Sequence, residues 1–250
     1  MLRDQFAKDH VELLQQTHDQ KFERLVGLDE RLAAGDETVF SRINHGSEAV
    51  TLITAMYGLG ASFAELRDQA RRIPGILVTT QDRIFNPHKT GGAVLVVLNA
   101  AALVALFEDE SGARQLIDVV ERFEVEDFLV DSYINSLVAF REPSPGLQMD
   151  VLDRNLGITK PSLYAGQREA AQLALAGDDV GAAEQLGRYV SQWYRTHAAS
   201  FEWLSPQRSG RFYSGDWCFT AAATAKVFGI DDAALEHHDR YPWDLAHPSG

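Results

Sequence analysis

The chain has 250 residues, of which 45% are hydrophobic and 24% are charged, and its formal net charge at pH 7 is −13. This length can bury a sizeable core, and the composition is that of an ordinary globular protein. The acidic balance argues against nucleic acid or an anionic membrane as a direct partner and favours a basic partner. The single cysteine, Cys218, excludes an internal disulfide and suits a reducing compartment.

The first half of the chain has the hydrophobic periodicity of helices. It predicts a long amphipathic helix over 2–34 and a second helix over 37–57. A third begins after Ser62, which forms a capping box with Glu65 and precedes a helix that stops before Pro74. The apolar segment 93–107 is about 15 residues, short of the roughly 20 that cross a bilayer. We therefore interpret it as a helix buried on all sides and expect no membrane partner.

The segment 76–90 is interpreted as a loop or an extra helix. Further helices are predicted near 113–122 and 127–140, and the sequence EPSPG at 142–146 is the clearest break in the chain. It divides the chain into an N-terminal helical half, 1–142, and a C-terminal half, 147–250, which we expect to pack as one globular unit.

The second half has the same pattern of helices separated by short turns, and helices are expected over 161–176, 182–197 and 220–227. Gly229 has the position of a helix stop, and Asp231 and Asp232 are N-cap candidates for a short helix through Glu236. Helices joined by short Gly/Asp turns recur without a strict period. The sequence therefore predicts an all-α fold of stacked antiparallel helical hairpins, as in bundles and α-solenoids.

Motifs of catalysis and cofactor binding are missing from the sequence. It has no phosphate-binding loop, no dinucleotide fingerprint and no H-E-x-x-H, and His45-Gly46-Ser47 is not a nucleophile elbow. His237 and His238 are adjacent, whereas two metal ligands on one helical face need a spacing of three or four. We expect no enzyme activity, no metal and no cofactor.

One stretch of the chain is strongly acidic. Between positions 108 and 131, nine carboxylates face only Arg114 and Arg122, which leaves a formal charge of −7. Such a run is either a solvated helix surface or a docking surface for a cationic partner, whose association its field would steer. The candidate residues are Glu108, Asp109, Glu110, Asp118, Glu121, Glu124, Glu126, Asp127 and Asp131. Eight aromatic residues between 193 and 219 could serve either the core or an interface.

The C-terminal third carries an ordered series of short motifs. They are Trp193-Tyr194, Gly215-Asp216-Trp217-Cys218-Phe219, Ala225-Lys226, Phe228-Gly229-Ile230-Asp231-Asp232 and Tyr241-Pro242-Trp243-Asp244-Leu245. This series resembles the immunity proteins of the PoNe/PoNi toxin–immunity family, with a looser match around Tyr57 to Leu66. Asp216 stands where that pattern commonly has an aromatic residue, and Thr220 where it commonly has Glu. The motif residues taken as structural are Trp193, Tyr194, Gly215, Trp217, Phe219, Lys226, Gly229, Asp231, Asp232, Tyr241, Pro242 and Asp244.

The resemblance implies an all-helical immunity protein that binds and neutralises a cognate antibacterial DNase of the PD-(D/E)xK class. Such toxins pass between competing bacteria through specialised secretion systems, so the immunity protein is expected in the cytoplasm, beside the chromosome. The implied partner is a basic DNase toxin, without direct contact to nucleic acid. Two other hypotheses are a helical-repeat scaffold that binds proteins without a toxin, and a metal-dependent hydrolase on a helical bundle.

Overall fold

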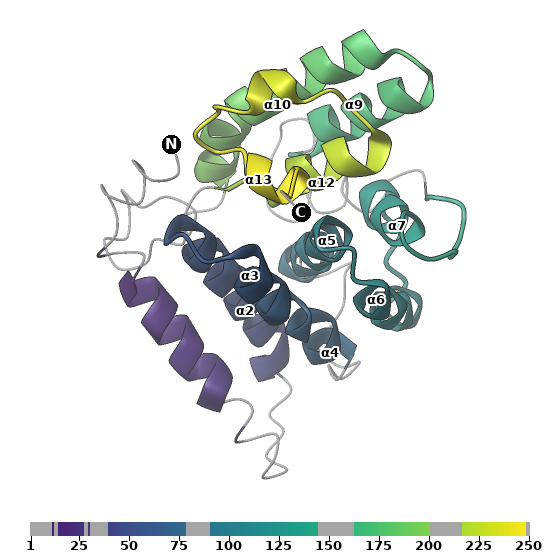
Figure 1. Ribbon diagram of the computed structural model, residues 1–250. Coiled ribbons are helices and arrows are strands. Elements are labelled where there is room, and N and C mark those ends of the chain that lie inside the picture. The colour runs from purple at the N-terminus through teal and green to yellow at the C-terminus, as the bar shows by residue number, and fades with distance from the viewer. Residues whose placement is uncertain are drawn as a thin grey trace.

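The computed structural model describes residues 12, 15–27, 30, 40–78, 91–144, 163–200 and 217–248, and helices are the only regular elements within these ranges. The all-α prediction is confirmed. Figure 1 shows the N-terminal helices on one side of the molecule and the hairpin of α9 and α10 on the other, with α5 and α12 between them.

The N-terminal part forms a layer of four helical segments. Residues 15–27 are helical and pack on α2 (Phe40–Gly58), where the Glu48 carboxylate binds Lys21 Nζ at 2.8 Å and Arg24 at 2.6 Å. The remainder of the helix predicted over 2–34 lies outside the described residues, apart from helical positions 12 and 30.

The next turn confirms one prediction and refines another. Ser62 caps α3 (Phe63–Ala70) in the predicted box with Glu65. After α3 a new helix begins at once, α4 (Arg72–Val78), and Pro74 lies in its first turn. Proline is tolerated there because a first-turn N–H has no partner within the helix.

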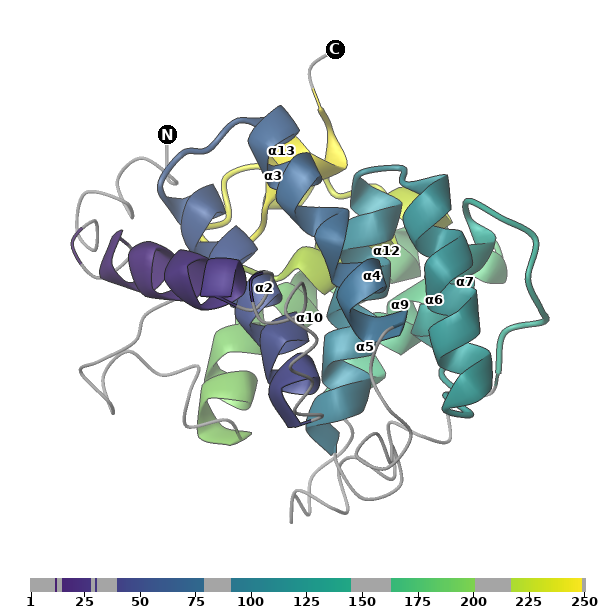
Figure 2. The same ribbon diagram turned by 90° about the horizontal axis from the view of Figure 1, so that it is seen from below.

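Three helices follow along the chain, and α5 (Gly91–Leu106) is buried over nearly all of its described side chains, as predicted. α6 (Glu110–Arg122) and α7 (Phe128–Asn135) lie beside it, and Figure 2 shows α4, α6 and α7 side by side. The helix predicted to run to 140 ends at Asn135. Its side chain accepts a hydrogen bond from Phe140 N and donates one to the Arg141 carbonyl, which turns the chain away from the helix.

The C-terminal part begins with an antiparallel hairpin of α9 (Ala165–Leu175) and α10 (Asp179–Ser200). α12 (Phe219–Phe228) packs on both α5 and α9, because its Ala-rich surface lets neighbouring helices approach. Gly229 ends α12 at φ 64°, which confirms the predicted helix stop. The chain closes with a 3₁₀ turn, η2 (Ala233–Leu235), and α13 (Trp243–Ala246).

A single hydrophobic core joins the described parts of the two predicted halves. It includes Leu103 of α5 and Tyr133 of α7 from the first half, and Leu186 of α10 and Ala222 of α12 from the second. The boundary at 142–146 stays a prediction, and residues 145 and 146 lie outside the described residues. Among the helices that are described, none combines the length and the apolar content that crossing a membrane requires.

Candidate functional site

The nine carboxylates of the acidic stretch separate into an exposed and a buried set. Asp109, Asp127 and Asp131 are buried, with exposed fractions of 8%, 1% and 0%. The sequence predicted these three residues as part of a docking surface, and their burial contradicts that prediction. The exposed set, which we call the acidic surface, lies on α6 and the turns that flank it. It consists of Glu108, Glu110, Asp118, Glu121, Glu124 and Glu126.

Asp127 serves as the N-cap of α7. Its Oδ1 atom accepts hydrogen bonds from Leu129 N at 3.0 Å and Val130 N at 3.1 Å, which satisfies two N–H groups that have no partner within the helix. Burial disfavours the charged form and raises the pKa of this carboxyl to about 6, against the lowering effect of the same two hydrogen bonds. Asp127 therefore stabilises the buried N-terminus of α7 and is not available on the protein surface.

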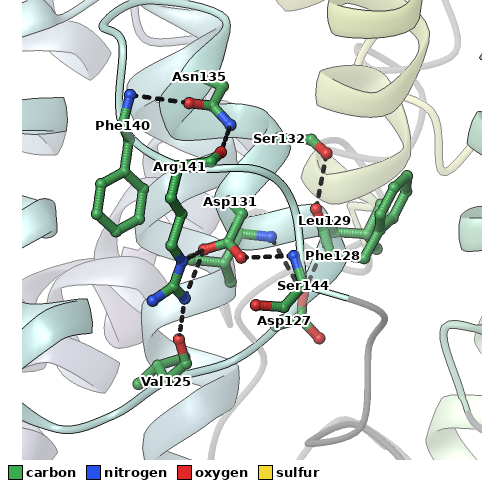
Figure 3. A network of polar contacts seen from close by, with 11 residues as sticks. Val125, Asp127, Phe128, Leu129, Asp131, Ser132, Asn135, Phe140, Arg141 and Ser144 are labelled. Atoms are coloured by element: carbon green, nitrogen blue, oxygen red, sulfur yellow. Dashed lines mark hydrogen bonds and ion pairs between the residues drawn. The ribbon is translucent and has the colours of Figure 1, made fainter.

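Asp131 holds the segment that follows α7, as Figure 3 shows. One carboxylate oxygen accepts two hydrogen bonds from Arg141, at 2.8 and 3.1 Å, and the other accepts Ser144 N at 2.9 Å. Arg141 also donates to the Val125 carbonyl at 2.5 Å. We call this cluster of Asp131, Arg141, Ser144 and Val125 the α7 latch. Its buried charge is paired, as a buried carboxylate must be.

Glu108 and Asp109, at the start of the acidic stretch, also make contacts within the fold. The Asp109 carboxylate lies so close to Gly112 that a Cβ at that glycine would come within 2.6 Å of Oδ2. Glu108 is exposed but forms an ion pair with Lys226 at 2.9 Å, and Lys226 Nζ also donates to the Leu106 carbonyl at the end of α5. Lys226, a residue of the family motif, thus joins α12 to α5.

The field of the acidic surface is weaker than the sequence alone indicates. Six carboxylates remain exposed, and the exposed Arg114 and Arg122 lie on the same helix, α6. Arg122 lies over the ring of Phe123 and donates to the Val78 carbonyl at 3.0 Å, so its position is fixed. Glu121, in the last turn of α6, and Glu124, in the turn that follows the helix, both remain exposed.

The motif residues at the C-terminus form an interlocked aromatic cluster. Trp217 and Phe219 are buried and meet the ring of Tyr57 edge-on, at centroid distances of 4.9 and 5.7 Å. The Tyr57 hydroxyl donates to the carboxylate of Asp244 in α13. This cluster fastens the chain end to α2, and Pro242, also buried, precedes α13.

The remaining aromatic candidates divide between core and undescribed positions. Trp193 belongs to the hydrophobic core. Gly215 and the side chain of Tyr194 lie outside the described residues, as do the four other aromatic residues of that stretch, Phe201, Trp203, Phe212 and Tyr213.

Asp231 and Asp232 were both predicted as N-cap candidates, and Asp232 does occupy the N-cap position of η2, but the side chains of the two residues have different roles. Asp231 Oδ1 accepts Ala233 N at 3.1 Å, as a capping residue does. The Asp232 side chain makes no capping bond and is buried. It accepts a hydrogen bond from Tyr241 Oη and contacts His247 Nε2 at 2.9 Å. The pair of Asp232 and Tyr241 thus docks the tail, which the capping pattern could not reveal.

A second buried polar cluster, which we call the neutral network, lies between α7, α9 and α12. Gln167 Nε2 donates to Tyr133 Oη at 2.6 Å and to the Thr220 carbonyl at 2.9 Å, and Thr220 Oγ1 donates to Gln167 Oε1 at 3.1 Å. Thr224 Oγ1 completes it, 2.7 Å from Tyr133 Oη. Thr220, which departs from the family pattern, is therefore part of an uncharged cluster. Sequence reasoning missed this cluster because its members are far apart in the chain.

The chemistry of the described residues gives no support to the hydrolase hypothesis. Among them, no group of three or more His, Cys, Asp or Glu side chains is placed to hold a metal ion. Cys218 is buried, and burial raises the pKa of its thiol to about 12, so that the thiol stays protonated at neutral pH.

Comparison with known proteins adds to what the helical fold and its C-terminal motifs show. Residues 152–245 match the family model of PoNe immunity proteins (PoNi), C-terminal. The chain therefore carries a PoNi C-terminal domain, and the predicted resemblance is confirmed over this segment. The proteins that this family model describes are immunity proteins against PoNe.

Other comparisons concern the fold and the curated proteins. The chain is similar to the crystal structure of protein PA2201 from Pseudomonas aeruginosa, with a TM-score of 0.65 and 17% sequence identity. The match covers 93% of this chain and 86% of that one, and at this identity it shows a shared fold alone. No curated protein matches the chain in sequence.

Proposed function

We propose that this protein binds a cognate PoNe-type DNase toxin and neutralises it in the cytoplasm of the producing cell. The observation that carries the proposal is the PoNi match over residues 152–245, which includes the motifs from Trp193 to Leu245. The cognate toxin is a basic protein partner, and the immunity protein acts by stoichiometric binding, without turnover.

The charge of the chain supports this function. A protein that cleaves DNA presents a positive surface to the phosphate backbone. A partner of formal charge −13 is attracted to that surface from a distance, which accelerates association and disfavours partners of the same sign. The acidic surface on α6 is one candidate for the contact, although it lies outside the segment that matches the family.

The proposal is tested by expressing the toxin encoded beside this gene in a susceptible bacterium. Cells that also express this protein should survive and keep intact chromosomal DNA, whereas cells with an empty vector should lose both. An inactive toxin variant in the same vector controls for the burden of expression. Survival that does not improve with the immunity protein, at confirmed expression of both proteins, would refute the proposal and favour the scaffold hypothesis.

A further inference from the structure

The turn between α9 and α10 exposes two large apolar side chains. Leu175 ends α9 with an exposed fraction of 67%, and Val180 follows the start of α10 with 71%. These are the highest values among the large hydrophobic residues that the structure describes. All six positions from 175 to 180 are exposed, and we call them the hairpin tip. In Figure 1 this turn lies at the outer edge of the molecule, at the upper right.

The hairpin tip has a fixed backbone. Gly177 N donates to the Ala174 carbonyl and Asp178 N to the Leu173 carbonyl, both at 3.0 Å, and Gly177 adopts φ 79°, which glycine does without strain. The Asp178 carboxylate accepts Gly181 N at 2.9 Å and so caps α10. A turn held in this way presents its side chains in one arrangement, so binding costs little ordering entropy.

The fold itself gains little from the two apolar side chains. α9 and α10 pack through buried residues such as Ala170, Ala171, Ala182 and Leu186. Leu175 lies one helical turn after Ala171, on the same face of α9. Its exposed fraction shows that α10 covers little of it. Polar residues at 175 and 180 would leave the helix interface intact, so the apolar surface is available for a partner.

The charged residues of the hairpin between Arg168 and Arg188, which border it, are all negative. The segment 169–187 contains Glu169, Asp178, Asp179 and Glu184 and no lysine or arginine. All four carboxylates are exposed. An apolar contact flanked by carboxylates complements a surface whose apolar recess is bordered by basic residues.

We infer that the hairpin tip docks on the cognate toxin, with Leu175 and Val180 in an apolar recess of its basic surface. This inference rests on the proposed function and gives it an interface. The tip lies within the segment that matches the family, 152–245, whereas the acidic surface does not. The hairpin tip is accordingly the principal contact, and the acidic surface contributes to steering.

The test measures binding to a nuclease-inactive variant of the toxin encoded beside this gene. L175S/V180S should bind with a dissociation constant raised about tenfold or more, because the central apolar contact is lost. V26S is the matched control. It removes an apolar side chain of 38% exposure from the helix at 15–27 and should bind like the wild type. Thermal unfolding of each variant checks that the fold is kept.

A second variant, D179N, removes one charge from the tip without changing its shape. It should reduce the association rate about twofold or more at low salt, and less as salt is added. Tight wild-type binding that neither L175S/V180S nor D179N alters would overturn the inference and leave the proposed function standing. A wild-type protein that fails to bind the toxin would instead refute the proposed function. A wild-type dimer that L175S/V180S converts to a monomer would assign the tip to self-association and also overturn the inference.

Discussion

The α7 latch and the acidic surface come from one acidic stretch of sequence and have opposite roles. In the latch, Asp131 is fully buried and each of its oxygens is bound by the segment 141–144. On the acidic surface, Glu121 and Glu124 point to solvent. The buried carboxylates differ from the exposed ones in their contacts, because Asp127 and Asp131 accept hydrogen bonds from backbone N–H groups. Asp127 and Asp131, at the start of α7, stabilise the fold, whereas the carboxylates along α6 stay exposed.

The largest expected effect comes from breaking the latch. Arg141→Ala leaves the Asp131 charge buried without its cationic partner, which should lower the free energy of unfolding by about 3–5 kcal/mol. Urea denaturation measures the change. Arg114→Ala, a matched control at an exposed position of α6, should change stability by less than about 0.5 kcal/mol. Equal effects of the two substitutions would show that the latch does not stabilise the fold.

The next effect depends on pH and concerns Asp127. Its pKa is raised from 3.8 to about 6 in the folded state, so the folded protein binds this proton more tightly than the unfolded chain. The contribution to stability is complete below pH 3.8 and is lost as pH rises through 6, a change of about 2–3 kcal/mol. Asp127→Asn keeps a good N-cap and removes the charge.

The comparison of Asp127→Asn with the wild type isolates this titration, because the other groups are common to both proteins. The variant should gain stability relative to the wild type as pH rises from 4 to 7.5. Denaturant midpoints measured across this range test the sign. A difference that stays constant with pH would contradict the raised pKa.

The neutral network should respond more weakly than the latch, because it carries no charge. Tyr133→Phe removes a hydroxyl that accepts from Gln167 and donates to the Thr220 carbonyl. The loss should cost about 2 kcal/mol, because buried polar groups lose a partner. Thermal or urea unfolding measures it. A cost as large as that of Arg141→Ala would mean that charge does not distinguish the two clusters.

The smallest effect on stability is expected on the acidic surface. The double substitution Glu121→Lys and Glu124→Lys should leave the free energy of unfolding within about 0.5 kcal/mol of the wild type. It should nevertheless slow association with the toxin and weaken the salt dependence of that association. Stopped-flow association kinetics at two ionic strengths test this, and unchanged kinetics would exclude these residues from steering.

The sequence predicted the helices well where local signals agree. The capping box at Ser62, the helix stop at Gly229 and the buried helix α5 each follow from residues close together in the chain. The end of α7 was predicted too late, because Asn135 bonds to residues five and six positions ahead. A hydrophobic pattern does not report such a side-chain bond to the backbone.

The candidate site was harder to predict because exposure depends on contacts distant in sequence. The burial of Asp131 depends on Arg141, and that of Asp232 on Tyr241, so the charge pattern alone could not separate them from exposed carboxylates. The exposed Leu175 looks like a core residue in sequence, because it continues the apolar row of α9. The structure shows that the packed hairpin ends there, so that little of the described part of the chain covers this side chain.

The central claim, that this protein neutralises a DNase by binding it, is tested most directly by titrating the purified toxin in a DNA-cleavage assay. With toxin concentration well above the dissociation constant, cleavage should fall linearly and stop at one equivalent of the immunity protein. A heat-denatured sample of the same protein should leave cleavage unchanged. Undiminished cleavage in the presence of a large excess of the folded protein would contradict the account.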